Sequence, residues 1–494
     1  MMKDIVIEEE MENKPLVGLE SHRRLAVKAK DGLTKDMIHF WMKGDIKKAR
    51  KDNLIEDHNL KDKYLEDRSA ILTSFLAQKA VVVLSRPMKW LGSHADSLLN
   101  LTSANHGFST LLINYAIGKL KKPKKEEQVS VIGHLDSRFE LDRNIKLDEP
   151  KYFPALCAMA SKIAYESPDF IQNVVENSWK MKMVGVGAQA FWNDYHGKNT
   201  THAFMMEDRD RVIVAFRGTQ VFDPDTWEMD VDISWFKFKG AGITHMGFMR
   251  ALGLVETEDG IKGWPTTLQD ETNPRAYYAI RDSLKILLVN NNKKFIVTGH
   301  SLGGALAVLF TAVLGFHAEN ELLDRLESVY TFGQPRVGNE KFGMFMEKIT
   351  MRDDQTSKYI RFVYGSDIVP RLPPWGYSYK HFGTCVYFNS FYEAHIIKGE
   401  IEEDYFSIRS RFIGRGIAGW EMVRSILRFN VMNGRDNNKE SILMTLIRAS
   451  FPEAAAHAPS DYVNATRLAS NLIFTIKFGL YGLGNNPGFK NIAN

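Results

Sequence analysis

The sequence predicts an α/β fold, and three observations support this prediction. After about residue 129, short apolar runs alternate with helical stretches, as expected for strands and helices in turn. The clearest strands are expected at residues 211–217, 295–298, 328–332 and 358–364. Between residues 294 and 310 the chain changes at Ser301 from a β-rich run to a helical run of small residues.

The composition excludes several classes of protein. Hydrophobic residues make up 44% and charged residues 25% of the 494 residues, which disfavours both a disordered chain and a polytopic membrane protein. The net charge of +4 is too small for a dedicated nucleic-acid binder. The two cysteines, Cys157 and Cys385, are far apart, which suits a reducing compartment. No metal-ligand spacing and no signal peptide are recognisable, so we expect no metal and no secretion.

The N-terminal part divides into two segments of different composition. Residues 1–70 are dense in charge and predict a solvated lead-in that is partly disordered or helical. Residues 71–128 contain a pair of amphipathic segments that end in a lysine cluster, and residues 97–118 are too polar for a membrane span. An apolar face beside lysines suits association with a membrane or droplet surface. Helices packed on the following domain, 129–494, are the alternative.

The turn at residues 299–303 has the G-x-S-x-G pattern of a nucleophile elbow. In such an elbow, strand and helix crowd together, so the positions two before and two after the serine must lack side chains. Gly299 and Gly303 satisfy this requirement, and Ser301 is the candidate nucleophile.

An activated serine needs a histidine base that a carboxylate orients. Asp367 follows the expected strand 358–364 and is the candidate acid, because the chain order of such sites is serine, acid, histidine. His381, His395 and His457 all follow it, and sequence spacing alone cannot choose between His395 and His457.

Several motifs together resemble the class 3 lipases. They occur in family order from residue 214 to residue 374. They are Val214-Ala-Phe-Arg-Gly-Thr219, His245-Met-Gly-Phe248, Gly299-His-Ser-Leu-Gly303, Tyr330-Thr-Phe-Gly-Gln-Pro-Arg-Val-Gly338 and Ser366-Asp-Ile-Val-Pro-Arg-Leu-Pro-Pro374. Three further motifs, near residues 86–92, 131–136 and 457–463, resemble the plant oil body lipases.

The resemblance implies an α/β-hydrolase fold. The chain also has the N-terminal amphipathic extension and a long insertion near 390–453, expected to be helical, by which it departs from the compact fungal members of the family. The resemblance implies that His457 is the catalytic histidine, with His395 as runner-up. The oxyanion donors would be the backbone N–H groups of Thr219 and Leu302. A lid is implied near 220–240, with Val221, Phe222 and Trp227 on one face. No metal or organic cofactor is implied.

The expected function is hydrolysis of long-chain triacylglycerols at the cytosolic surface of an oil body or lipid droplet, or of another intracellular membrane. A phospholipase A1 or galactolipase is the alternative enzyme, because the same site could serve either lipid. A catalytically silent lipase-like binding scaffold is the alternative of another class. The amphipathic segment 71–125 could also mediate self-association.

Overall fold

A computed structural model gives the fold of most of the chain. The described residues are 24–27, 32–52, 54–58, 68–124, 127–194, 196–220, 223–238, 240–254, 265–267, 273–289, 292–354, 356–373, 379–397, 444, 447–448 and 450–475.

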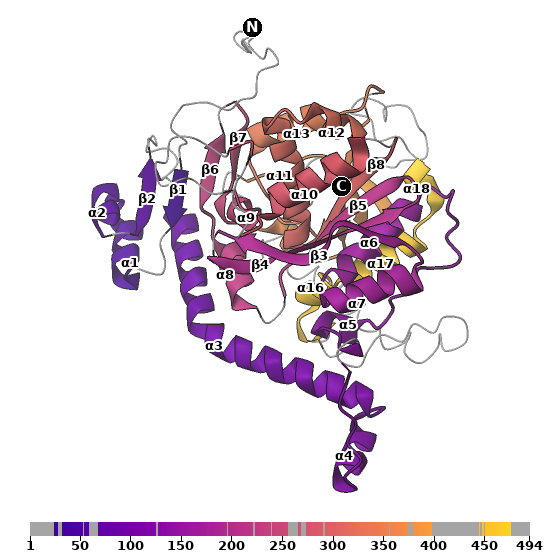
Figure 1. Cartoon of the computed structure of the whole chain (residues 1–494). Coiled ribbons are helices and arrows are strands. Elements are labelled where there is room, and N and C mark those ends of the chain that lie inside the picture. The colour runs from indigo at the N-terminus through magenta and orange to yellow at the C-terminus, as the bar shows by residue number, and fades with distance from the viewer. Residues whose placement is uncertain are drawn as a thin grey trace.

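An eight-stranded mixed sheet forms the centre of the molecule, in the order β12-β11-β10-β9-β8-β5-β4-β3 (Figure 1). The five strands from β11 to β5 are parallel, and the strands beyond them at both edges are antiparallel. The predicted strands are confirmed, and the predicted α/β class with them. The strands are β3 (Lys182–Asn193), β4 (Lys198–Asp208), β5 (Arg211–Phe216), β8 (Lys294–His300), β9 (Leu326–Phe332), β10 (Tyr359–Tyr364), β11 (Thr384–Phe388) and β12 (Ala394–Ile397).

Helices cover both faces of this sheet, because its central strands carry apolar side chains on both faces and each face must be buried. One core contains side chains of α9 (Met246–Ala251), α10 (Ala276–Val289), α11 (Leu302–Phe316), α12 (Asn320–Arg325) and α13 (Glu340–Thr350). The other contains side chains of α6 (Tyr152–Ile163), α7 (Pro168–Asn173), η3 (Val174–Ser178), α17 (Pro459–Leu468) and α18 (Asn471–Thr475). The short elements α5 (Val131–Leu135), η4 (Val369–Arg371) and α16 (Pro452–Ala455) lie in connecting segments.

A second, four-stranded antiparallel sheet joins the N-terminal segment to the main body. Its order is β2-β1-β6-β7, formed by β1 (Arg24–Val27), β2 (Ile55–His58), β6 (Trp235–Phe238) and β7 (Gly242–His245). Helices α1 (Thr34–Lys43) and α2 (Ile46–Lys51) connect its first two strands. The sequence predicted a solvated lead-in here, but Val27, Phe40 and Ile55 pack with Trp235 in a buried core. The charge density of the segment concealed these widely spaced apolar residues.

The segment predicted to be amphipathic forms two helices, α3 (Arg68–Ala104) and α4 (Phe108–Ala116). The first turns of α3 are anchored by Ile71 and Phe75 in the core beside the four-stranded sheet. The helix then runs along the body past α8 and α5 to α4 (Figure 1). Within the described ranges, α3 meets the length and composition of a membrane span, with 28% of its apolar window buried. Its exposed large apolar side chains are Leu76, Val82, Val83, Leu84, Trp90, Leu91 and Leu98, and those of α4 are Phe108, Leu112, Ile113 and Tyr115.

Candidate active site

Ser301 lies in a tight turn between β8 and α11. Its φ of 57° and ψ of −130° place a residue with a side chain in strained backbone geometry. A Cβ atom on Gly299 would lie 2.2 Å from the carbonyl of Gly303, and one on Gly303 would lie 2.2 Å from the carbonyl oxygen of Phe216. Because neither position can hold a side chain, the glycines allow the turn that presents the Ser301 hydroxyl.

The structure brings the three predicted residues of the site together. His457 Nε2 lies 2.8 Å from Ser301 Oγ, and His457 Nδ1 lies 2.8 Å from Asp367 Oδ2. Asp367 is fully buried in the loop after β10, and His457 lies between α16 and α17. This geometry allows the imidazole to take the serine proton while the carboxylate orients the ring.

The other two histidines lie elsewhere. His395 is on the edge strand β12, opposite Tyr387 of β11. His381 Nε2 hydrogen-bonds the carbonyl oxygen of Pro370. Neither residue lines the cavity that contains Ser301.

Two aromatic residues that the sequence did not single out support the site. The hydroxyl of Tyr462 donates a hydrogen bond to Asp367 Oδ2. His300 Nε2 lies 2.8 Å from the carbonyl oxygen of His457, and His300 Nδ1 lies 2.8 Å from the hydroxyl of Tyr165. Burial, with a further contribution from His457, holds the pKa of His300 well below its usual value. A neutral His300 therefore donates to the His457 carbonyl and accepts from Tyr165, which fixes the backbone that carries His457.

The predicted oxyanion residues, Thr219 and Leu302, line the same cavity as Ser301. Leu302 is the first residue of α11, so its N–H group has no acceptor within the helix. The hydroxyl of Thr219 donates to Asp230 Oδ2 at 2.6 Å. Asp230 lies on α8 (Pro224–Val231). The sequence did not single it out, because it is one of several acidic residues in this stretch. Burial raises the pKa of this carboxyl to about 7.

The raised pKa of Asp230 predicts a pH effect on stability. A carboxyl with a raised folded-state pKa stabilises the fold below its unfolded pKa, near 3.8, and loses that contribution as the pH rises to about 7. Asp230→Asn removes the titration and keeps an acceptor for Thr219. One pKa unit corresponds to about 1.4 kcal/mol. The Tm of the variant minus the Tm of wild type should therefore increase by several degrees from pH 5 to pH 8. Thermal unfolding at both pH values tests this, and a Tm difference that is independent of pH would contradict it.

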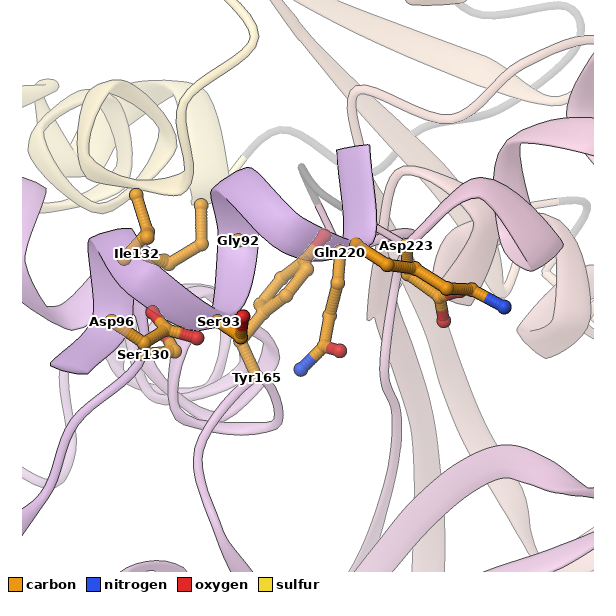
Figure 2. A pocket seen from close by; sticks show the side chains of 10 residues that line it. Gly92, Ser93, Asp96, Ser130, Ile132, Tyr165, Gln220 and Asp223 are labelled. Atoms are coloured by element: carbon orange, nitrogen blue, oxygen red, sulfur yellow. The ribbon is translucent and has the colours of Figure 1, made fainter. Parts of the chain in front are cut away.

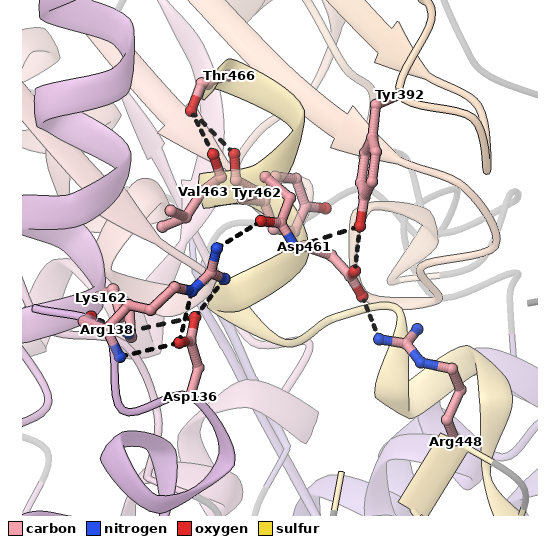
Figure 3. A network of polar contacts seen from close by, with 10 residues as sticks. Asp136, Arg138, Lys162, Tyr392, Arg448, Asp461, Tyr462, Val463 and Thr466 are labelled. Carbon is pink, nitrogen blue, oxygen red and sulfur yellow. Dashed lines mark hydrogen bonds and ion pairs between the residues drawn. The ribbon is translucent and has the colours of Figure 1, made fainter. Parts of the chain in front are cut away.

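A buried network of charges holds the segment that follows His457 (Figure 3). Arg448 Nη2 lies 2.9 Å from Asp461 Oδ2, and both side chains are almost fully buried. Asn464 lies on α17, like Asp461, and accepts a hydrogen bond from Arg138. Arg138 also pairs with Asp136. Removing one partner of a buried pair typically costs about 3–5 kcal/mol. The network therefore ties α17 to the segments on both sides of it.

Lys162 is the third cation of this network. Its Nζ lies 3.3 Å from Asp136 Oδ2 and donates to the carbonyl oxygen of Arg138. Burial lowers the pKa of Lys162 to about 8. Burial alone would raise the pKa of Asp136, but Lys162 and Arg138 lower it to about 2.

Ser301 lines an apolar cavity of about 480 Å³. Part of its wall comes from segments far from the elbow in sequence: α3, α5 and the end of the predicted insertion. Trp227 of α8 also lines it, whereas Val221, Phe222 and most of the predicted insertion lie outside the described residues. Lining side chains from these segments are Ala95, Leu98, Leu99, Val131, Ile132, Leu135, Met444 and Ile447. In the described ranges, no group of three or more His, Cys, Asp or Glu residues could hold a metal ion.

Comparison with known proteins identifies the family. Residues 213–377 match the family described as "Lipase (class 3)". The chain is 37% identical over 451 residues to the triacylglycerol lipase OBL1 of Arabidopsis thaliana, covering 82% of this chain and 86% of that protein. The chain belongs to the class 3 lipases. This lipase is thus an ester hydrolase of the serine type.

Two further known proteins are similar to this class 3 lipase, over different shares of the chain. It is 33% identical over 552 residues to the triacylglycerol lipase OBL1 of Nicotiana tabacum, covering 92% of this chain and 96% of that protein. Among solved structures it is similar to lipase II of Rhizopus niveus, with 22% identity, a TM-score of 0.37, and coverage of 52% of this chain and 86% of that one.

Proposed function

We propose that this lipase hydrolyses long-chain triacylglycerols through an acyl-enzyme formed on Ser301. The observation that carries the proposal is the hydrogen-bonded chain from Ser301 through His457 to Asp367, in which Ser301 and His457 line an apolar cavity. The relatives that cover most of the chain are named triacylglycerol lipases, which supports the substrate class.

In the proposed reaction, Ser301 Oγ attacks the ester carbonyl carbon while His457 Nε2 takes the hydroxyl proton. The carbonyl oxygen becomes an oxyanion that the N–H groups of Thr219 and Leu302 stabilise. His457 returns the proton to the leaving glycerol oxygen as the C–O bond breaks. Water then attacks the acyl-enzyme, with His457 again as base, and releases the fatty acid.

Hydrolysis of a triolein emulsion by the purified chain tests this activity. We expect oleate release that depends on the emulsion surface. Cleavage of p-nitrophenyl butyrate without release of oleate from triolein would contradict the proposed substrate class.

Within the segment near 220–240 where a lid is expected, α8 is the candidate lid, whereas β6 is paired in the four-stranded sheet. Trp227 of α8 lines the cavity, and Asp225 of the same helix pairs with Lys89 of α3 at 3.3 Å. Helix α3 also carries exposed apolar side chains that could contact lipid. A movement of α3 on lipid contact would therefore change its ion pair with α8. We therefore propose that α8 opens at the lipid surface.

We propose that residues 71–128 hold the lipase on an oil body or other lipid droplet, or on an intracellular membrane. The support is the apolar surface of α4, where Leu112, Ile113 and Tyr115 are 54%, 59% and 74% exposed. Lysines 119, 121, 122 and 124 follow this helix and suit an anionic lipid surface.

A triple variant, Leu112→Asp, Ile113→Asp and Tyr115→Asp, should weaken this association. Each buried apolar side chain is worth about 1.5–3 kcal/mol, so droplet binding should fall by at least about tenfold. Flotation with triolein droplets measures it, and the p-nitrophenyl butyrate rate reports the fold. The matched control, Ser103→Asp, His106→Asp and Ser109→Asp, adds the same charge at exposed polar positions. Equal flotation of both variants would show that anchoring lies elsewhere.

A further inference from the structure

One wall of the cavity that contains Ser301 comes from helix α3, which lies far from the elbow in sequence. Ala95, Leu98 and Leu99 of this helix line the cavity. Their spacing places the three side chains on one face of the helix. The family match covers residues 213–377, so this α3 wall comes from a segment outside the match.

A row of leucines on the outer surface of α3 leads to the cavity. Leu84, Leu91 and Leu98 are seven residues apart, which places them about two turns from each other along one side of the helix. All three side chains are exposed, and Leu98 is both 52% exposed and part of the cavity lining. The cavity therefore reaches the molecular surface at the end of this leucine row.

The α3 wall is held in place by the segment that begins α5. The side-chain amide of Asn100 donates to the carbonyl oxygen of Val129 at 2.9 Å and accepts from the N–H group of Val129 at 2.9 Å. The N–H group and the hydroxyl of Ser130 donate to the carboxylate of Glu166, at 2.6 Å and 2.8 Å. Because Glu166 lies between α6 and α7, these contacts tie α3 to the body of the protein.

The other side of the contact between α3 and α5 is polar. A smaller pocket lies there (Figure 2), and among its lining residues are Gly92, Ser93, Asp96, Ser130 and Ile132. Ile132 also lines the catalytic cavity, so the α3–α5 contact separates the two spaces. An acyl chain that extends from Ser301 towards α3 would thus meet a fixed apolar wall.

Ala95 has the smallest side chain of the three that form the α3 wall. It is partly buried and lies inside a long helix, where a larger apolar residue is compatible with helical structure. A larger side chain at this position would fill space that an acyl chain could otherwise occupy. Because packed apolar groups cannot share space, the size of residue 95 limits how much of a chain the cavity holds.

We infer that the α3 wall binds the acyl chain of the substrate, and that the small side chain of Ala95 makes room for long chains. The leucine row gives such chains an apolar path from the lipid surface to the wall. The inference rests on the proposed function and deepens it, because it names the residues that recognise a long acyl chain. It gives α3 a role in substrate selection in addition to the proposed attachment to lipid.

The test measures kcat/KM of the purified full chain on p-nitrophenyl butyrate, octanoate, laurate and palmitate in micelles of one detergent. The readout is the palmitate ratio, defined as kcat/KM on the palmitate ester divided by kcat/KM on the butyrate ester. In Ala95→Phe this ratio should fall by about tenfold, as expected when about two methylene groups lose their apolar contacts. Ala95→Val and Ala95→Leu should give smaller losses in order of side-chain size, and the preferred ester should become shorter along the series.

Ser97→Phe is the matched control, because it adds the same ring to the same helix. Ser97 is exposed, does not line the cavity, and lies about 200° around the helix from Ala95. Its palmitate ratio should stay within about twofold of wild type, as is usual for a surface substitution. Thermal unfolding shows whether each variant is folded, and flotation with triolein droplets shows whether it still binds a lipid surface.

Three results would overturn the inference. One is a palmitate ratio within about twofold of wild type in a folded Ala95→Phe variant. Should that variant not fold, equal ratios in Ala95→Val, Ala95→Leu and wild type count in the same way. Another is an equal loss in Ser97→Phe and Ala95→Phe. The third is a loss in Ala95→Phe that a parallel loss of droplet flotation explains.

The proposed function is judged separately, by hydrolysis of triolein by the wild-type chain. Wild-type hydrolysis of triolein together with an unchanged palmitate ratio in Ala95→Phe would overturn the inference alone. Absence of triolein hydrolysis by wild type would overturn the proposed function, so the two failures are distinguishable.

Discussion

Ser301→Ala should abolish ester hydrolysis and leave the fold intact. The change removes the oxygen atom that lies 2.8 Å from His457 Nε2 and that forms the acyl-enzyme in the proposed reaction. By analogy with other serine hydrolases, we expect the rate to fall by about 10⁴-fold or more. The assay is the rate on triolein and on p-nitrophenyl butyrate.

The loss can be assigned to chemistry only if the variant is folded. Alanine is smaller than serine at this tight turn and requires the same positive φ, so we expect an unfolding transition close to that of wild type. A folded Ser301→Ala variant with substantial turnover would remove Ser301 from its proposed role.

His457→Ala should be almost as damaging, whereas His395→Ala should be nearly silent. His457 contacts both Ser301 and Asp367, so its loss removes the base and leaves the buried Asp367 without its imidazole partner. We expect a rate loss of about 10⁴-fold. His395 lies on an edge strand and outside the cavity, and its replacement should change the rate by less than about twofold.

The two histidine variants control for each other, because both remove an imidazole from the same fold. kcat and KM on p-nitrophenyl butyrate, measured side by side, give the comparison. A larger loss in His395→Ala than in His457→Ala would reassign the base.

The elbow and the acid could be predicted from sequence because their signals are local. Two glycines around Ser301 and a change from strand to helix are visible within seventeen residues. Asp367 follows a strand and precedes a proline, which marks the carboxyl edge of a parallel sheet where such residues gather. The observed strands β8 and β10 agree with the predicted ones.

The histidine could not be chosen from local signals. His457 is 156 residues from Ser301, and their contact depends on how the chain between them folds. The resemblance to a family selected His457, and the structure places it at 2.8 Å from Ser301 Oγ. Local pattern alone made His395, after a strand, equally attractive.

Other features were missed because they depend on long-range pairing. Tyr462 reaches Asp367 across 95 residues. The strand β1 pairs with β6, more than 200 residues later in the chain. Short strands of this kind have little pattern of their own, since their stability comes from the partner strand.

The most direct test of the proposed activity compares three lipids with the purified full chain. Triolein, phosphatidylcholine and galactolipid are presented at equal surface area, and fatty-acid release is measured, with Ser301→Ala as the blank. We expect triolein to be hydrolysed fastest and the blank to release nothing. Faster release from phosphatidylcholine or galactolipid than from triolein would contradict a triacylglycerol lipase and support a phospholipase A1 or a galactolipase.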